Sequence, residues 1–389
     1  MIMRLPLVLM VLAGFATHAV AEPDSRNLER SLARSLQAVG ENRLDVALNE
    51  VDSLLKLNPD FKLAQLVRGD LLLARSQPLR DFGNAPDAPR ELLQDLREEA
   101  QVRLQRAQRQ QPIAVPRYLW QLNPQQRYAV VVDTSKSTLY LYENVNGEPR
   151  YVADYYISMG KNGADKVVEG DQKTPLGVYF VKGYIPRQKL ADLYGAGAYP
   201  ISYPNEWDVR QGRSGHGIWL HGTPSNTYSR APRASNGCVV LANDDLLRLG
   251  RDITVGATPV IITGRMDWLD DTDRAEREAL LSAIEQWRKA WESRNTGSYL
   301  AHYAPDFSTG KVARAAFAQQ KQQVNTGKTW IRVKVDNLSI FPYPTQPDLV
   351  VVNFDQDYAS NNLVNRMHKR QYWQKRDGRW QIVYEGSAS

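Results

Sequence analysis

One cysteine occurs in the chain, Cys238, near the end of the stretch HGTPSNTYSRAPRASNGCVVL that runs from His221 to Leu241. A cysteine nucleophile needs a base that removes the thiol proton and donors that stabilise the oxyanion on the attacked carbonyl. Histidine is the natural base near neutral pH, and His221 lies 17 positions before Cys238, at the end of the run GIWLHG. Gly237 adds no side chain beside the thiol and can adopt unusual backbone angles. These residues predict a cysteine–histidine site for acyl transfer.

A lone cysteine has other uses, because it can form an intermolecular bridge or act as a buried small apolar residue. Zinc binding by Cys238, His221 and His216 is disfavoured, since their spacing fits no usual ligand pattern and a second cysteine is lacking. The sequence therefore predicts neither a metal nor a cofactor. His216 precedes His221 by five residues, so in an alternating strand the two would point to opposite faces. His216 is expected at the rim of the site.

Other motifs accompany the cysteine stretch. They are the T-P-x-G-x-Y strand within GDQKTPLGVYFV, the aromatic segment AYPISYPNEWD and the terminal run GATPVIITG. Combined with H-G and S-x-G-C, they resemble the L,D-transpeptidase catalytic domain, also called the YkuD family, from about Tyr128 to Gly264. A lone S-x-G-C would be a weak signal, but the combination is specific.

The resemblance implies a role for each residue of the motif. Cys238 would be the nucleophile and His221 its base, with the imidazole oriented by the carbonyl of Gly222. Ser235 would form a hydrogen bond within the site. The amides of Gly237 and Cys238 would form the oxyanion hole.

This chain departs from the family pattern at two positions. Asn236 stands where many members have histidine, and Val240 where many have arginine or asparagine. Loss of an arginine at 240 affects recognition of a substrate carboxylate, and arginines in the preceding loop could replace its charge. The residues predicted to bind substrate are Asn236, Arg233, Arg230, His216 and Tyr203. Two polar loops, VVEGDQ and YSRAPRA, are candidate lids.

The resemblance also implies the substrate, which is the tetrapeptide stem of bacterial peptidoglycan. The thiolate would attack the carbonyl of the L-centre of the diamino acid, and the terminal D-alanine would leave. An amine of a neighbouring stem would then give a cross-link, which is L,D-transpeptidation and the first prediction. Water would instead give a tripeptide, which is L,D-carboxypeptidation and the alternative. A non-catalytic wall-binding scaffold is the alternative of another class.

The elements that must position this site belong to a multidomain chain. Residues 27–108 are predicted to be α-helical, because apolar residues recur at three- and four-residue spacing and Asn58-Pro59 marks a turn. This region resembles one tetratricopeptide unit, and the alternative is a plain helical hairpin that docks a protein partner or self-associates. A linker, QQPIAVPRYLW, follows.

Residues 127–264 are predicted to form a mostly-β catalytic domain. RYAVVVDTSKSTLYLYENVNGEPRYVADYY indicates a β-meander with a turn at Asn146-Gly147. GIWLHG and ATPVIITG are short strands, and NDDLLRLG is a helix expected to stop at Gly250.

Residues 272–389 are predicted to form an α+β cone, with one long helix against a bent antiparallel sheet. The spacing of Trp287, Trp291, Tyr299, Tyr303 and Phe307 resembles SnoaL-like, or nuclear-transport-factor-2-like, domains. Pairing such a cone with a YkuD domain resembles the cell-shape L,D-carboxypeptidase branch of the family. Its pocket residues (His302, His368, Asp306 and Tyr303) are interpreted as serving binding rather than chemistry.

The N-terminus indicates export. One basic residue, Arg4, precedes an apolar run, and Ala19 and Ala21 form an A-x-A site before Glu22. This is typical of a signal peptide over residues 1–21, cleaved after Ala21, so we expect a periplasmic protein without a membrane span. The net charge of +6 becomes +5 once Arg4 is lost. Scattered charges without a basic block argue against nucleic-acid binding.

Overall fold

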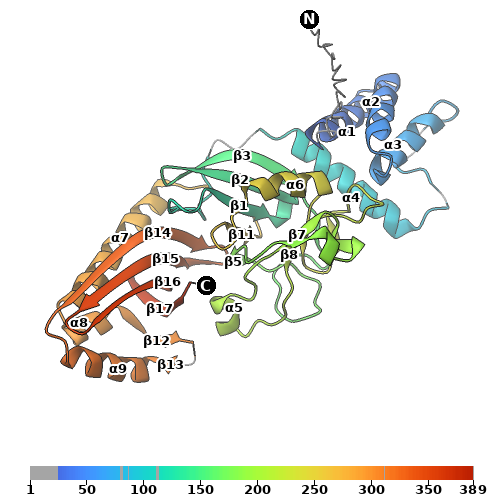
Figure 1. The fold of residues 1–389 in the computed structure, drawn as a ribbon. Coiled ribbons are helices and arrows are strands. Elements are labelled where there is room, and N and C mark those ends of the chain that lie inside the picture. Colours follow the sequence, from blue (N-terminus) through green and yellow to red (C-terminus); the bar gives the residue numbers. More distant parts are fainter. Residues whose placement is uncertain (1–24, 79–81, 86, 111–113, 311, 389) are drawn as a thin grey trace, which may run out of the picture.

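Three regions follow one another along an elongated molecule (Figure 1). The computed structural model describes residues 25–78, 82–85, 87–110, 114–310 and 312–388. The predicted signal peptide and its cleavage site after Ala21 lie outside these residues. Within the described ranges, the helices are all too short or too polar to cross a membrane.

The N-terminal region is helical, as predicted, with α1 (Ser25–Gly40), α2 (Leu44–Leu57), α3 (Lys62–Leu73) and α4 (Arg90–Ala107). α2 ends just before the Asn58-Pro59 turn, and its Asn58 backbone N–H donates to the carbonyl of Leu54. Ala47, Val51 and Leu54 on α2 are buried with residues of α1 and α3. The 3.6-residue periodicity of the sequence therefore marks the face that forms this small core.

The first sheet of the predicted catalytic domain contains the predicted meander. Its strand order is β3-β2-β1-β11-β5, and the bounds are Tyr128–Asp133 for β1, Thr138–Val145 for β2, Glu148–Tyr156 for β3, Gly177–Phe180 for β5 and Pro259–Thr263 for β11. β11, the closing strand, pairs parallel with β1. Strands β1 and β11, in the interior of the sheet, are buried on both faces, which explains why their residues are nearly all apolar.

A second, smaller sheet carries the cysteine–histidine stretch. Its order is β10-β8-β7-β6, with bounds Ile185–Pro186 for β6, Gly197–Pro200 for β7, Trp219–His221 for β8 and Val239–Val240 for β10. β4 (Met159–Gly160) pairs with β9 (Arg233–Ser235) beside it. Three short 3-10 helices lie at Thr134–Lys136, Arg187–Lys189 and Asp192–Tyr194, and α5 spans Glu206–Arg210.

The helix after the cysteine corrects one expectation. α6 spans Asn243–Asp252 and passes through Gly250 instead of stopping there. A side chain at Gly250 would place its Cβ 2.3 Å from the hydroxyl of Tyr199 on β7. The glycine is therefore explained by the close approach of α6 to the sheet, which a sequence pattern cannot distinguish from a helix stop.

The C-terminal domain is the predicted α+β cone. Its sheet has the order β13-β12-β17-β16-β15-β14, with bounds Tyr303–Thr309 for β12, Val312–Ala313 for β13, Ile331–Tyr343 for β14, Gln346–Ser360 for β15, Leu363–Arg376 for β16 and Arg379–Ser387 for β17. The helices are α7 (Asp271–Glu292), α8 (Thr296–Leu300) and α9 (Arg314–Thr326). Trp287, Tyr299 and Phe307 fill the space between α7 and the sheet, so the aromatic spacing of the sequence marks the core of the cone.

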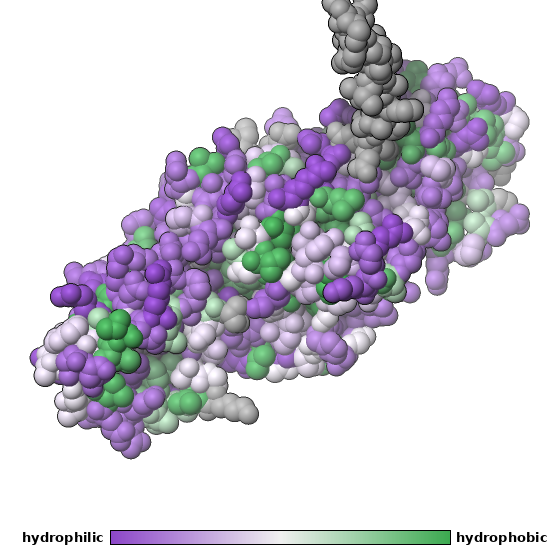
Figure 2. Space-filling model, in the orientation of Figure 1, coloured by the Kyte–Doolittle hydropathy of each residue, from purple (hydrophilic) through white to green (hydrophobic). Residues whose placement is uncertain are grey.

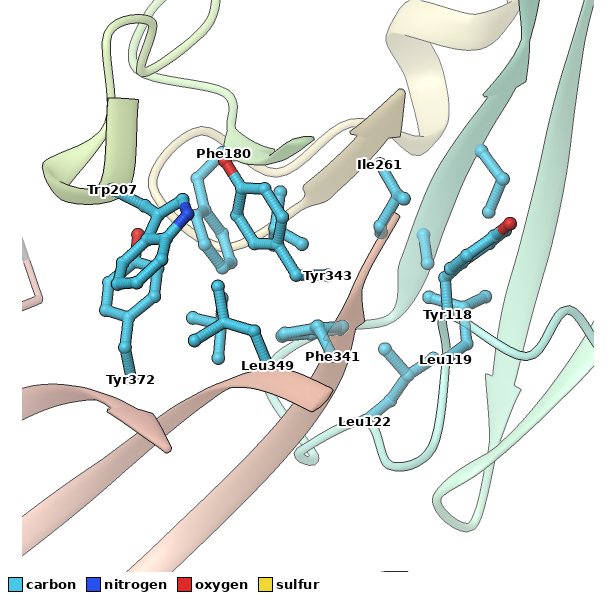
Figure 3. Packing of buried hydrophobic residues seen from close by; sticks show 14 of the residues in the cluster. Tyr118, Leu119, Leu122, Phe180, Trp207, Ile261, Phe341, Tyr343, Leu349 and Tyr372 are labelled. Carbon is cyan, nitrogen blue, oxygen red and sulfur yellow. The ribbon is translucent and has the colours of Figure 1, made fainter. Parts of the chain in front are cut away.

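A shared hydrophobic core joins the catalytic and C-terminal domains (Figure 3). Trp207 of α5 stacks on Tyr372 of β16, with ring centroids 5.8 Å apart and 17° between planes. Tyr118 and Leu119, from the stretch expected to be a linker, are buried in the same core. That stretch contains enough apolar surface to pack, and from Val115 to Leu122 it is a structural part of the interface. Elsewhere, the face in Figure 2 is mostly hydrophilic, with apolar side chains in small separate groups.

Trp207→Ala is predicted to lower the free energy of unfolding by about 3–5 kcal/mol, because it leaves a cavity in the shared core. Circular dichroism in urea measures the change. The control is Val209→Ala on the same helix, where the side chain is 63% exposed and the expected change is within about 0.5 kcal/mol. A loss below about 1 kcal/mol for Trp207→Ala would mean that the two domains are coupled elsewhere.

Candidate active site

Pairing of two short strands brings Cys238 and His221 together. β10 runs parallel to β8, with Val239 opposite Leu220 and Val240 opposite His221. The ladder continues because the Leu241 amide donates to the carbonyl of His221 over 2.9 Å. Cys238 is thus level with Trp219, and alternation places the side chains of Cys238 and His221 on one face of the pair. The pairing of β10 with β8 therefore places Cys238 and His221, 17 positions apart in the sequence, on neighbouring strands of the small sheet.

His221 is held in one tautomer. Its Nδ1 lies 2.7 Å from the carbonyl oxygen of Gly222, so Nδ1 carries the proton and donates it there. This leaves Nε2 free of its own proton and able to accept one, as a general base requires. The ring is 3% exposed and makes an edge contact with Tyr194 at 5.1 Å between centroids. The predicted orienting role of Gly222 thus has a direct geometric basis.

Gly222 must be glycine for a packing reason. A Cβ there would lie 2.1 Å from Oδ1 of Asn243 and 2.9 Å from the amide nitrogen of Ala196. Asn243, the first residue of α6, accepts from the Ala196 amide at 2.8 Å and donates to the Thr223 carbonyl at 2.9 Å. The backbone after His221 is therefore clamped on both sides. Asn243 escaped sequence reasoning, since it looked only like a helix start.

The environment of Cys238 makes its thiol a weak acid. Burial raises the pKa of Cys238 above its ordinary value, while a backbone hydrogen bond from Trp219 and the charges of Arg230 and Lys166 offset part of that rise. The thiol donates to the carbonyl of Gly217 at 3.5 Å. Burial also lowers the pKa of His221 to about 4, against the opposing bond to Gly222, and the charge of Arg230 adds to the lowering.

These two pKa shifts define the resting state of the pair. At neutral pH, the medium is above the pKa of His221 and below that of Cys238, so the imidazole is neutral and the thiol keeps its proton. The pair is therefore a neutral thiol beside a neutral base and not a preformed thiolate–imidazolium pair. The proton has to move to Nε2 as the sulfur attacks, which is general base catalysis.

Ser235 fixes the turn that presents the cysteine. Its hydroxyl donates to the carbonyl of Cys238 at 2.7 Å and accepts from the amide of Gly237 at 3.1 Å. Gly237 has φ +117°, and a Cβ there would lie 2.7 Å from the carbonyl oxygen of Lys173, so only glycine fits. Because the Gly237 amide is used inside the turn, the Cys238 amide is the better placed of the two predicted oxyanion donors.

The five predicted substrate-binding residues are not placed alike. Arg230 is half-buried, and its charge acts on both Cys238 and His221. Arg233 is exposed on β9, which precedes the cysteine turn. Asn236 is exposed and accepts from the side chain of Gln172 at 3.3 Å. Of the two arginines, Arg230 is therefore the one directed at the catalytic pair.

His216 and Tyr203 lie away from the chemistry. His216 is exposed, 3.6 Å from the carboxylate of Glu169, and sits in the coil before β8 rather than in the strand. The strand argument for its orientation was wrong, because β8 begins only at Trp219. Tyr203 is 6% exposed, packs edge-on against Tyr179 and donates to the carbonyl of Ser214 at 2.8 Å. Its ring belongs to the hydrophobic core and supports the 203–214 segment.

The predicted residues of the C-terminal pocket do not form one cluster. Tyr303 is buried and hydrogen-bonded to Glu385 inside the cone. Asp306 faces the other way and pairs with Arg376 and Arg210. His368 lies 2.5 Å from Asp355 on the neighbouring strand. Among the described residues, moreover, His, Cys, Asp and Glu nowhere gather in threes as a metal site would need.

Comparisons with known proteins agree with this geometry. Residues 127–262 match the L,D-transpeptidase catalytic domain family, YkuD. The middle of the chain is an L,D-transpeptidase catalytic domain. Residues 279–386 match the Cds6 C-terminal NTF2-like domain, which confirms the predicted cone. The N-terminal helices lie outside both matches.

Two solved structures are similar to most of this chain. Bd1075 from Bdellovibrio bacteriovorus is 28% identical with a TM-score of 0.61, and the match covers 70% of this chain and 97% of that one. The helical cell shape determining protein Pgp2 from Campylobacter jejuni is 25% identical with a TM-score of 0.60, covering 70% of this chain and 96% of that one. No curated protein sequence gave a significant match.

Two further side chains, Thr174 and Asp171, form hydrogen bonds in the L,D-transpeptidase domain near the Ser235–Cys238 turn. Thr174, from the T-P-x-G-x-Y motif, donates to the carbonyl of Gly237 at 3.0 Å and accepts from the amide of Gly160 at 2.9 Å. Asp171 accepts from Nζ of Lys166 at 2.7 Å and from backbone amides of the same loop, which lowers its pKa to about 2. Hydrogen bonds and an ion pair therefore stabilise the VVEGDQ loop, a predicted lid. Thr174 could have been identified from the sequence, because it is the first residue of the T-P-x-G-x-Y motif.

The neutral state of the pair in the L,D-transpeptidase domain predicts the pH dependence of thiol reactivity. Alkylation of Cys238 by iodoacetamide, followed by mass spectrometry of the intact chain, is expected to keep accelerating above pH ~8.5, the ordinary pKa of a free thiol. The unfolded chain in urea serves as the reference, because its thiol titrates near that value. A rate that is already maximal between about pH 5 and 8 would reveal a thiolate–imidazolium pair and contradict the prediction.

Proposed function

We propose that this chain is an L,D-transpeptidase that acts on tetrapeptide stems of peptidoglycan through an acyl-enzyme on Cys238. One observation carries the proposal: Cys238 and His221 share one face of a parallel strand pair, and the Gly222 carbonyl fixes the tautomer that leaves Nε2 as the base. Family membership of residues 127–262 supports the reaction class. The substrate follows from that class.

The proposed reaction proceeds in two stages through an acyl-enzyme on Cys238. Nε2 of His221 takes the thiol proton while the sulfur attacks the carbonyl carbon of the L-centre of the diamino acid. The Cys238 amide stabilises the oxyanion. The carbon–nitrogen bond to the terminal D-alanine then breaks, and the departing amine receives the proton from His221. An amine of a second stem attacks the thioester, forms the cross-link and regenerates the thiol.

Arg230 is proposed to bind the carboxylate of the terminal D-alanine. The position that many family members use for this charge holds Val240, which is 2% exposed and pairs with His221 across the strands. Arg230 supplies a positive charge at the same pair from a different segment. An arginine–carboxylate pair provides both energy and orientation, because two parallel N–H donors can bind the two oxygens.

L,D-carboxypeptidation is the second candidate function. It uses the same acyl-enzyme, with water instead of an amine as the final nucleophile, so that a tripeptide stem is released. The observation that favours it is the likeness over most of this chain to Pgp2, a helical cell shape determining protein. Both reactions place the enzyme in the periplasm, which the predicted signal peptide of residues 1–21 also favours.

The test is mass spectrometry of the mature protein incubated with disaccharide tetrapeptide. A dimer linked through two diamino-acid residues supports transpeptidation, and a disaccharide tripeptide supports carboxypeptidation. Both products are expected to vanish in Cys238→Ala and in His221→Ala. If neither product forms and Cys238 carries no acyl adduct, the catalytic proposal fails and the wall-binding scaffold replaces it.

Arg230→Ala is predicted to lower kcat/KM for the tetrapeptide by about ten- to a hundredfold, mainly through KM, because it removes a charge-assisted hydrogen bond to the substrate. Steady-state kinetics on the disaccharide tetrapeptide measure it. Arg233→Ala is the matched control and is expected to change kcat/KM by about twofold at most, since Arg233 is exposed. Equal losses in the two variants would contradict the role given to Arg230.

A further inference from the structure

The loop that carries Arg230 is held by the N-terminal helices. Residues 223–232 connect β8 to β9 and thus lie between His221 and the cysteine turn. The amide of Tyr228 donates to the carbonyl of Asp60, in the α2–α3 turn, at 3.3 Å. The ring of Tyr228 packs against Phe61 with centroids 4.4 Å apart. Tyr228 is 5% exposed and belongs to the hydrophobic core of the helical region.

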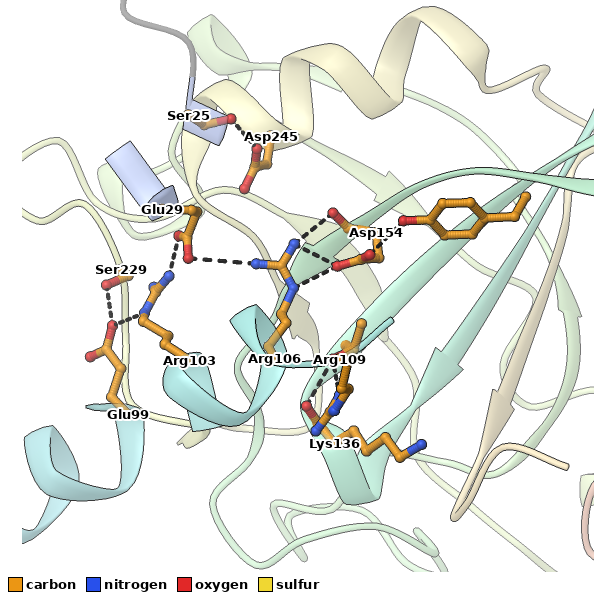
Figure 4. Close-up of polar contacts among 12 residues, drawn as sticks. Ser25, Glu29, Glu99, Arg103, Arg106, Arg109, Lys136, Asp154, Ser229 and Asp245 are labelled. Carbon is orange, nitrogen blue, oxygen red and sulfur yellow. Dashed lines mark hydrogen bonds and ion pairs between the residues drawn. The ribbon is translucent and has the colours of Figure 1, made fainter. Parts of the chain in front are cut away.

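A second set of contacts, from α4, holds the next residue of the loop (Figure 4). Ser229 donates from its hydroxyl to Oε1 of Glu99 at 2.6 Å. Glu99 pairs with Arg103 at 2.9 Å, and Arg103 also pairs with Glu29 of α1. The guanidinium of Arg103 lies over the ring of Tyr156, 3.8 Å from its centroid. The helical region and β3 thus meet at Arg103.

Tyr156 continues these contacts to Arg230 itself. Its hydroxyl donates to the backbone carbonyl of Arg230 at 2.9 Å. Three consecutive loop residues, Tyr228, Ser229 and Arg230, are therefore fixed by Asp60 and Phe61, by Glu99, and by a tyrosine that Arg103 covers. The backbone of Arg230 is thus fixed by Tyr156, and from this position the charge of Arg230 acts on both Cys238 and His221.

Energetics favour a positioning role for these buried charges. Glu99 and Arg103 are 2% and 3% exposed, and burial of such a pair contributes little net stability because desolvation offsets the attraction. A directional network of this kind instead selects one geometry, since any other arrangement leaves a buried charge unpaired. The geometry that this network selects is that of the loop next to the active site.

We propose that the N-terminal helical region is a positioning module for the active site, in which Asp60, Phe61 and Glu99 hold the 223–232 loop so that Arg230 stays beside Cys238 and His221. The inference rests on the proposed function only for the role of Arg230 in substrate binding. Tyr228 and Ser229 are positioning residues that act through Arg230.

The test measures the apparent pKa of Cys238 in the full mature chain from the pH dependence of iodoacetamide alkylation, which needs no substrate. The charged groups that act on the thiol are Arg230 and Lys166, and the titratable His221 lies on the paired strand. Arg230→Ala is expected to raise the apparent pKa of Cys238 by about one unit, because a nearby positive charge is lost. Tyr228→Ala is expected to shift it in the same direction, and Tyr228→Phe to restore the wild-type value.

The matched control is Leu71→Ala. Leu71 is 2% exposed in the same helical core as Tyr228, so its truncation also creates a cavity there, but it leaves the loop contacts in place. Ser229→Ala is the milder variant that removes only the bond to Glu99, and its expected shift is smaller than that of Tyr228→Ala. Leu71→Ala is expected to leave the thiol pKa unchanged.

The double variant Tyr228→Ala/Arg230→Ala separates direct from indirect action. If Tyr228 acts through Arg230, the double variant has the thiol pKa of Arg230→Ala alone. Additive shifts, an equal shift in Leu71→Ala, or unchanged values in both Tyr228→Ala and Ser229→Ala would overturn the positioning role.

KM for the disaccharide tetrapeptide is measured in parallel and is expected to rise in Tyr228→Ala with kcat nearly unchanged. A wild-type chain that turns over no tetrapeptide refutes the proposed function, whereas the alkylation profiles still decide the positioning role.

Discussion

The catalytic arrangement depends on the parallel pairing of β8 with β10, two strands of three and two residues. Strands so short have little stability of their own, so neighbouring elements must hold them. Asn243 clamps the backbone after His221, and Ser235 and Thr174 fix the turn before Val239. The glycines at 222 and 237 follow from this constraint, because clamping atoms occupy the space of a side chain.

Burial of the pair has a chemical consequence. The same desolvation that raises the pKa of Cys238 lowers that of His221, so both groups are neutral at rest. A neutral thiol is a poor nucleophile but resists oxidation, which follows thiolate character. An anionic substrate that pairs with Arg230 offsets the positive charge that disfavours a protonated imidazole. In the proposed reaction, substrate binding would therefore make proton transfer easier at the moment when the acyl donor is present.

The sequence predicted the parts of this molecule that depend on local patterns. Helical periodicity located α2 and α3, alternation and Asn146-Gly147 located the β2–β3 hairpin, and the aromatic spacing located the core of the cone. Sequence patterns failed to predict the role of a residue where long-range packing determines that role. Gly250 marks a close approach to Tyr199, Tyr203 is a core residue, and the 115–122 stretch is an interdomain core segment. Asn243 and Glu99 gave no signal, because the contacts that position the site, to Ala196 and to Ser229, join residues 47 and 130 positions apart in the sequence.

A charge on a connecting loop differs physically from a charge on a strand. At position 240 the backbone would be fixed by the ladder to His221, so an arginine there would need no further support. Arg230 lies in the eleven-residue connection between β8 and β9. If this connection were mobile, ordering it at each binding event would cost conformational entropy. Contacts to Asp60, Phe61, Glu99 and Tyr156 already order the loop in the folded chain, so this entropy is not lost when substrate binds. If Arg230 binds the substrate carboxylate as proposed, its loop gains from a rigid neighbour, and the N-terminal helices are the neighbour that contacts this loop.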